Sequence, residues 1–211
     1  EDTPPEVLLA VSGRETPTQW LDGDRLVFNA GFSAGENDIW TVEVSDTASA
    51  EPYLSAEGNR IWASVAPQGD LAAYESNESG RMEVHVRSFP VARQPTSVSS
   101  GGGERPRWSP DGSTICSWRS VEGGQADSLF AATVQREPAF AVLSTEFVLA
   151  LAGDYRARAW DLHPDGDRFI VTRVVQEGQA TGGDLGEGDR ERHLIVTNWF
   201  TELLAAVGEG N

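Results

Sequence analysis

The chain has 211 residues, of which 39% are hydrophobic and seven are tryptophan, so it can bury a sizeable core and is not a disordered sequence. Its formal net charge is −17, and a surface of that sign repels phosphate backbones and anionic lipids. Nucleic acid is therefore not an expected partner. No stretch is apolar for long enough to span a bilayer, so direct membrane insertion is not expected either.

The N-terminus shows no initiator methionine, no basic region and no apolar run of a signal peptide, so we expect a mature or excised piece. The first segment with strand character is Glu6–Ser12. It resembles the outer strand of a sheet whose other strands are missing.

A short pattern then occurs four times: an apolar residue, a tight turn rich in Pro, Asp and Gly, and an apolar strand-like run. The turn glycines are Gly23, Gly69, Gly112 and Gly166, which lie 46, 43 and 54 residues apart. A period of this length is typical of a repeat architecture.

The segments between the turns alternate polar and apolar residues, as in Asp38–Val44 and Met82–Phe89. Period-two alternation predicts half-buried strands, and turn signals every eight to twelve residues predict antiparallel meanders. We therefore expect an all-β protein, a β-propeller of four-stranded antiparallel blades with about four blades in this chain. The expected blades cover about 15–55, 56–99, 100–146 and 154–204, within one propeller domain or propeller fragment over 1–211, with 6–12 as the outer strand.

Three segments differ from the pattern. Residues 146–158 lengthen the third interval and include an apolar run at 147–152, whereas 176–192 are rich in glycine and acids and predict an exposed loop. The best helical candidate is the short segment Trp199–Val207.

Several stretches carry a family resemblance. Residues 75–90, the Gly101–Gly112 stretch with its Ser-Pro-Asp-Gly turn, residues 160–169 and the terminal stretch 195–203 resemble TolB-like, or WD-like, propeller repeats. Residues 160–169 and 195–203 also resemble the C-terminal propeller of bacterial membrane-anchored serine/threonine kinases. The similarity covers most of residues 17–204.

This resemblance implies a non-catalytic propeller that acts as a sensor or protein-binding surface outside the cytoplasm, with no catalytic residue, cofactor or metal to carry over. The sequence contains neither a kinase nucleotide loop nor a His-Arg-Asp catalytic loop. Propellers of this family usually have six or more blades, so an expected count of four leaves two alternatives. The N-terminal strand closes a four-bladed ring, or the chain is an arc whose apolar faces and edges need another chain.

The residues that could serve catalysis or binding are explained by structural roles in the repeat pattern. Asp22, Asp111 and Asp165 precede the turn glycines, where aspartate caps backbone N–H groups, and Gln68 in the second copy shows that no carboxylate is required. Cys116, the only cysteine, lies in an apolar run and predicts a packed small residue.

Metal binding is not expected. His85, His163 and His193 have no ligand spacing, and the glycine- and aspartate-rich segment 182–189 occurs only once. Trp20, Trp62, Trp108 and Trp160 stand at matching positions near the turns, which predicts packing between blades. A single exposed tryptophan would instead offer a ligand platform.

The sequence thus favours a non-catalytic module that binds a protein or a small molecule. Two alternatives stay open. One is an enzyme of the lyase or glycosidase type, which needs two or three carboxylates converging at one end of the channel. The other is an assembly subunit, a possible homo-oligomer that pairs through uncovered propeller edges.

Overall fold

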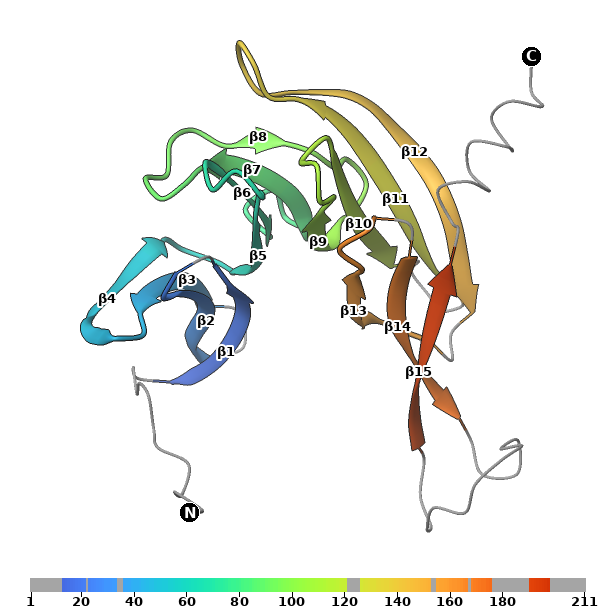
Figure 1. The fold of residues 1–211 in the computed structure, drawn as a ribbon, viewed down its shortest axis with the longest axis horizontal. Helices are drawn as coiled ribbons and strands as arrows, with labels where there is room; N and C mark the ends of the chain where they lie inside the picture. Colours follow the sequence, from blue (N-terminus) through green and yellow to red (C-terminus); the bar gives the residue numbers. More distant parts are fainter. Residues whose placement is uncertain are drawn as a thin grey trace. The chain divides into compact units, whose positions relative to one another are not determined.

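A computed structural model describes residues 13–21, 23–33, 36–120, 126–152, 155–166, 168–175 and 190–197. The chain divides into two compact units, Glu1–Pro106 and Arg107–Asn211. Strands and turns make up the described part, which contains no helix (Figure 1). The expected outer strand at 6–12 and helix at 199–207 lie outside the described residues, as does Asp22.

The first unit holds two four-stranded antiparallel sheets in which the strands follow chain order. Sheet 1 consists of β1 (Arg14–Trp20), β2 (Arg25–Ser33), β3 (Glu36–Glu43) and β4 (Asp46–Leu54). Sheet 2 consists of β5 (Arg60–Val65), β6 (Leu71–Ser76), β7 (Glu83–Ser88) and β8 (Thr96–Ser97).

Sheet 3 is also four-stranded, and sheet 4 has three strands within the described part of the chain. Sheet 3 consists of β9 (Glu104–Trp108), β10 (Thr114–Ser120), β11 (Ala126–Gln135) and β12 (Ala141–Ala152). Sheet 4 consists of β13 (Tyr155–Leu162), β14 (Arg168–Val175) and β15 (Arg190–Thr197). The prediction of four-stranded antiparallel sheets is confirmed.

The strand ends differ from the sequence expectation in two places. β12 continues to Ala152, beyond the expected blade limit near 146, because the apolar run pairs with β11 through Phe147↔Phe130 and Leu149↔Leu129. β15 begins at Arg190, so the last residues of the expected 176–192 loop belong to a strand that pairs with β14. Residues 176–189 lie outside the described part.

The four turn glycines all adopt positive φ, from 72° at Gly112 to 85° at Gly23. This left-handed region is open to glycine at little cost, whereas a side chain there is strained. Asp111 stabilises its turn by accepting hydrogen bonds from the Ser113 N–H at 3.0 Å and the Ser109 hydroxyl at 2.6 Å. The interpretation of Asp111 as a turn residue is therefore confirmed.

Sheets 1 and 2 pack face to face through one hydrophobic core. Val27 and Ile39 of sheet 1 meet Val65, Ala72 and Tyr74 of sheet 2, and all five side chains are buried. Since an antiparallel sheet has two faces, these contacts fix which face of each sheet is directed at its neighbour.

Sheets 3 and 4 pack in the same way within the second unit. Cys116 and Trp118 of β10 contact Trp160, Phe169 and Val171 of sheet 4. Trp118 meets Trp160 edge to face at a centroid distance of 5.7 Å. Burial raises the pKa of the Cys116 thiol to about 12, so this cysteine is a packed thiol, as the sequence predicted.

A repeated polar contact supplements the packing. Trp62 and Arg105 occupy matching positions at the start of β5 and β9, and both have positive φ, 57° and 53°. The Trp62 N–H donates to Oδ1 of Asn29 at 3.0 Å, and the Arg105 N–H donates to Oε2 of Glu75 at 2.9 Å. Asn29 and Glu75 occupy matching positions on β2 and β6. In both cases a side chain of the second strand of one sheet accepts a hydrogen bond from the backbone of the first strand of the next sheet.

Candidate functional site

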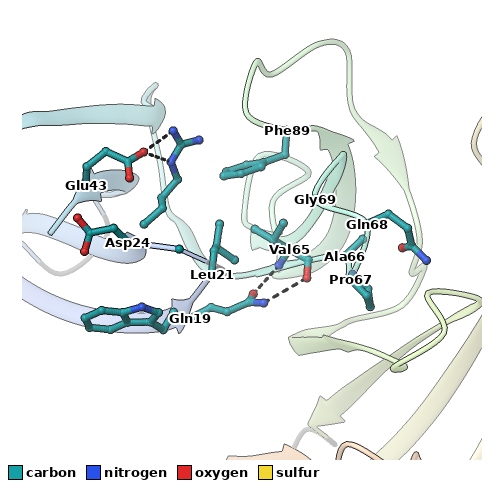
Figure 2. Close-up of a pocket in the computed structure, with 13 residues that line it drawn as sticks. Gln19, Leu21, Asp24, Glu43, Val65, Ala66, Pro67, Gln68, Gly69 and Phe89 are labelled. Atoms are coloured by element: carbon teal, nitrogen blue, oxygen red, sulfur yellow. Dashed lines mark hydrogen bonds and ion pairs between the residues drawn. The ribbon is translucent and has the colours of Figure 1, made fainter. Parts of the chain in front are cut away.

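A pocket of about 700 Å³ opens at the turn end of the first unit, between sheets 1 and 2 (Figure 2). Its lining comes from the ends of β1, β3 and β5, the start of β2, the turns that follow β1 and β5, and the residue after β7. The lining residues are Gln19, Trp20, Leu21, Gly23, Asp24, Arg25, Glu43, Val65, Ala66, Pro67, Gln68, Gly69 and Phe89.

The two repeat turns set the walls of the pocket. The Leu21 N–H donates to the Arg25 carbonyl at 2.8 Å, and the Ala66 N–H donates to the Leu71 carbonyl at 2.8 Å. The first turn is thus one residue shorter than the second. Gly69 has φ +74° with no atom within 4 Å of the position of a Cβ, so backbone conformation rather than crowding requires glycine there.

Gln19 joins the two sheets at the base of the pocket. Its Nε2 donates to the Val65 carbonyl at 3.3 Å, and its Oε1 accepts the Val65 N–H at 2.6 Å (Figure 2). The side-chain amide therefore pairs with a backbone peptide group as a strand neighbour does. This two-point contact fixes the spacing of the walls across 46 residues of sequence.

One end of the pocket is charged. Asp24 and Glu43 lie on the same side of it, away from Val65 and Gln68 (Figure 2). Arg25 pairs with Glu43, with Nη2 2.5 Å and Nε 2.6 Å from Oε1. Asp24 accepts the Ser45 N–H at 2.5 Å, and its hydrogen bonds with Ser45 lower the pKa of the carboxyl. Asp24 is therefore ionised at neutral pH.

The other end is apolar and continuous with the core. Val65, Ala66 and Phe89 are buried, and Leu21 packs against the same core. Phe89 is held edge to face against Tyr53 at a centroid distance of 5.1 Å, and the Tyr53 hydroxyl donates to the Ser88 carbonyl at 2.7 Å. A pocket with an apolar floor and a few fixed polar groups is the usual form of a ligand site.

Trp20 departs from the expected packing. It lies at the pocket rim and is 60% exposed, whereas Trp108 and Trp160 are buried as predicted and Trp62 is half-buried under the Arg105 guanidinium, 3.2 Å from the ring centroid. Leu21 faces sheet 2, so its neighbour Trp20 points to the opposite face of sheet 1. Phe28, Ala30 and Val42 on that face are buried, so the exposure is particular to Trp20.

The remaining candidates from the sequence do not converge on the pocket. Asp111 and Asp165 lie in turns of the second unit, and Asp165 pairs there with His163 and Arg168 at 2.8 and 2.5 Å. His85 is buried in β7, and its closest ion-pair contact is Glu78 at 3.8 Å. Among the described residues, no group of three His, Cys, Asp or Glu could hold a metal ion. Segment 182–189 and the side chain of His193 lie outside that part.

The sequence did not identify the residues that shape the pocket. Gln19, Arg25 and Glu43 are ordinary polar residues of strands and turns, and no local motif marks them. One signal was present: the repeat pattern aligned the turns after β1 and β5, so residues beside both turns were candidates for a shared site.

No family model matches the chain, and no curated protein is similar to it in sequence. Solved structures are similar in fold. TolB from Acinetobacter baumannii superposes with a TM-score of 0.66 at 14% identity, over 90% of this chain and 43% of that one. A protein assigned as TolB from Agrobacterium tumefaciens gives 0.60 at 16%, over 84% and 59%. An oligogalacturonate lyase in complex with manganese gives 0.50 at 11%, over 70% and 43%.

The four sheets thus have the TolB-like β-propeller fold, and the expected fold class is confirmed. This chain spans less than two thirds of either TolB structure, and identities of 14% and 16% show the fold alone.

Proposed function

We propose that this chain is a non-catalytic propeller module that binds a protein segment or a small molecule in the pocket between sheets 1 and 2. The pocket carries the proposal: it is of ligand size, it has an apolar floor and a charged end, and Gln19 holds its walls at a fixed distance. Proteins use such rigid, concave sites to reduce the entropy lost on binding.

The carboxylates at the charged end of the pocket support binding, because the protein holds them in fixed positions. Asp24 is held in the ionised form by Ser45, and Glu43 is engaged by Arg25. Both groups are therefore suited to orienting a ligand that carries N–H donors.

The wider setting is a sensor module outside the cytoplasm, attached to a bacterial signalling kinase or belonging to a related secreted protein. The resemblance of residues 160–169 and 195–203 to kinase-associated propellers supports this setting. The net charge of −17 favours partners other than nucleic acids and anionic membranes.

The test is an NMR titration of the isotopically labelled chain with tripeptides that have blocked termini and differ in the central residue. We expect changes in the backbone amide chemical shifts of Gln19, Leu21, Val65 and Gly69. Gln68→Trp places an indole at the pocket mouth and should abolish them. Gln94→Trp makes the same change in an exposed loop outside the pocket and should leave them intact.

Shifts elsewhere in the chain, or shifts that survive Gln68→Trp, would contradict binding in this pocket. Turnover of an oligosaccharide or peptide that disappears on substitution of Asp24 or Glu43 alone would instead establish the enzyme alternative.

A further inference from the structure

Each four-stranded sheet ends in an outer strand that has a single strand neighbour within the described residues. These outer strands are β4, β8 and β12 (Figure 1). The free side of such a strand presents backbone N–H and C=O groups that can pair with another extended segment. Soluble proteins protect outer strands with charged side chains, with proline or by keeping the strand short.

Two of these three outer strands carry such protection. β4 contains the acids Asp46 and Glu51 and also Pro52, which has no backbone N–H. β8 has only two residues. In contrast, β12 has twelve residues, no proline and a single charged residue, Glu146. A long strand of low charge without proline pairs readily with other strands, so β12 is the outer strand of the three that favours a partner.

The middle of β12 is accessible. Residues 143–147 are all exposed, and the two apolar side chains among them, Leu143 and Phe147, are 62% and 53% exposed. Pairing with β11 is regular over Ser144–Phe147, and the register shifts on either side of this stretch. The exposed part of β12 therefore has the regular strand geometry that a further strand needs for pairing.

The sequence of this stretch is complementary to itself in the antiparallel direction. Two strands related by a two-fold axis place one residue opposite its own copy and the others opposite residues equally far beyond the axis. With the axis at Thr145, Leu143 lies opposite Phe147 twice, and Ser144 lies opposite Glu146 twice. Aromatic and aliphatic side chains stabilise such cross-strand pairs, and a serine hydroxyl can donate to a carboxylate.

The neighbouring registers are less favourable. An axis at Glu146 brings two carboxylates directly opposite one another, and like charges in that position are destabilising. An axis at Ser144 places Leu143 opposite Thr145 and so separates it from Phe147. Charge and apolar pairing thus select the same register.

We propose that two copies of this chain associate edge to edge through β12, antiparallel, about a two-fold axis at Thr145. The two copies of sheet 3 then form one continuous sheet. Such an isologous contact uses both free edges and closes at the dimer. The contact lies in the second unit, whereas the pocket lies in the first, so this inference does not depend on the proposed function.

Oxidative cross-linking tests the position of the axis. Opposed residues of antiparallel strands have Cα atoms about 4.5–5.5 Å apart, which a disulfide can bridge. We therefore expect Thr145→Cys to form a disulfide-linked dimer under mild oxidation. The control is Ala150→Cys, which is also exposed but lies roughly 30 Å from its own copy in this register. Cys116, the native cysteine, is buried and does not compete.

The result that would contradict this axis is a cross-linking rate for Ala150→Cys equal to that for Thr145→Cys. Faster cross-linking of Glu146→Cys than of Thr145→Cys would also contradict it, because the two carboxylate positions would then face one another.

Sedimentation velocity of the full chain over a wide range of concentration tests the dimer itself. Two copies that each carry −17 repel one another, so sodium chloride is added to screen that repulsion. We expect a concentration-dependent dimer whose dissociation constant rises roughly tenfold in Leu143→Lys and in Phe147→Lys, because each lysine enters the contact twice. Val91→Lys adds the same charge to an exposed loop residue and should leave the dimer unchanged.

Circular dichroism melting of each variant verifies that it is folded. A strict monomer at all concentrations would overturn the proposal. A dimer that both lysine variants leave unchanged would overturn it as well, since the contact would then lie away from β12.

Discussion

Single residues stabilise this protein through charge as well as through packing, and Glu83 is the clearest case. Its carboxylate accepts the N–H groups of Gly101 and Gly102, both at 2.9 Å, and the Ser99 hydroxyl at 2.5 Å. Arg81 Nε lies 2.8 Å away. The glycine-rich loop 101–103 is thereby attached to β7 by one side chain, although glycine loops have little preference of their own for a single conformation.

Glu83 also gives the protein a predictable acid sensitivity. Burial alone would raise the pKa of its carboxyl, but the hydrogen bonds from Ser99, Gly102 and Gly101 and the charge of Arg81 outweigh burial and lower it. Its stabilising contribution is therefore complete above the pKa of the unfolded chain and is lost as pH falls through the lower pKa of the folded chain.

We expect Glu83→Gln to lower the free energy of unfolding at neutral pH by about 1–3 kcal/mol, since hydrogen bonds to a charged acceptor are replaced by weaker ones. We also expect its stability to decline less than that of the unmodified chain between neutral pH and acid. Urea unfolding at a series of pH values measures both effects, with the exposed Glu51→Gln as the matched control. If the free energy of unfolding of Glu83→Gln and that of the unmodified chain changed in parallel with pH, this role of Glu83 would be contradicted.

At the scale of elements, hydrogen bonds between the second strand of one sheet and the first strand of the next set how neighbouring sheets align. Trp62 and Arg105 hold a backbone conformation that costs a residue with a side chain roughly 1–3 kcal/mol. The side-chain oxygens of Asn29 and Glu75 offset this cost by accepting hydrogen bonds from the N–H groups of Trp62 and Arg105. The matching position in sheet 3 is Trp118, whose Nε1 has no partner among the described residues, and there aromatic packing replaces the polar tie.

Asn29→Ala should therefore destabilise the protein by about 1–3 kcal/mol, because it leaves the Trp62 N–H without an acceptor. Asn29→Asp retains an oxygen in the same place and should recover most of that loss. Urea unfolding measures the difference, and the Trp62 amide should exchange faster with solvent in Asn29→Ala alone. Equal stability of the alanine and aspartate variants would show that the side chain acts by size and not as an acceptor.

The elements themselves were predictable because strand alternation and turn chemistry are local. The glycines at 23, 69, 112 and 166 and the strands around them follow from a pattern of a few residues. The ties and the pocket were not predictable, since Gln19 meets Val65 and Asn29 meets Trp62 across long separations with no shared motif. The sequence did not predict the exposure of Trp20 either, because the alternation of polar and apolar residues indicates the face on which a side chain lies but not what covers that face.

At the scale of the whole molecule, two of the hydrophobic cores are each confined to one unit. The core that includes Val27 and Tyr74 draws all its residues from the first unit, and the core that includes Leu129 and Phe169 draws all its residues from the second. In repeat architectures, stability is approximately a sum of repeat terms and nearest-neighbour contacts, so damage to one core need not spread to the other.

Leu129→Ala should cost about 2–5 kcal/mol, since the leucine is fully buried and its removal leaves a cavity between sheets 3 and 4. We expect the loss to appear as faster hydrogen exchange of amides in β10, β11 and β14, with much smaller changes in β2 and β6. Val27→Ala should give the reverse distribution, because Val27 lies in the other core. Native-state hydrogen exchange by mass spectrometry measures both variants, and an equal loss of protection in the two units would instead indicate that the sheets unfold as one cooperative body.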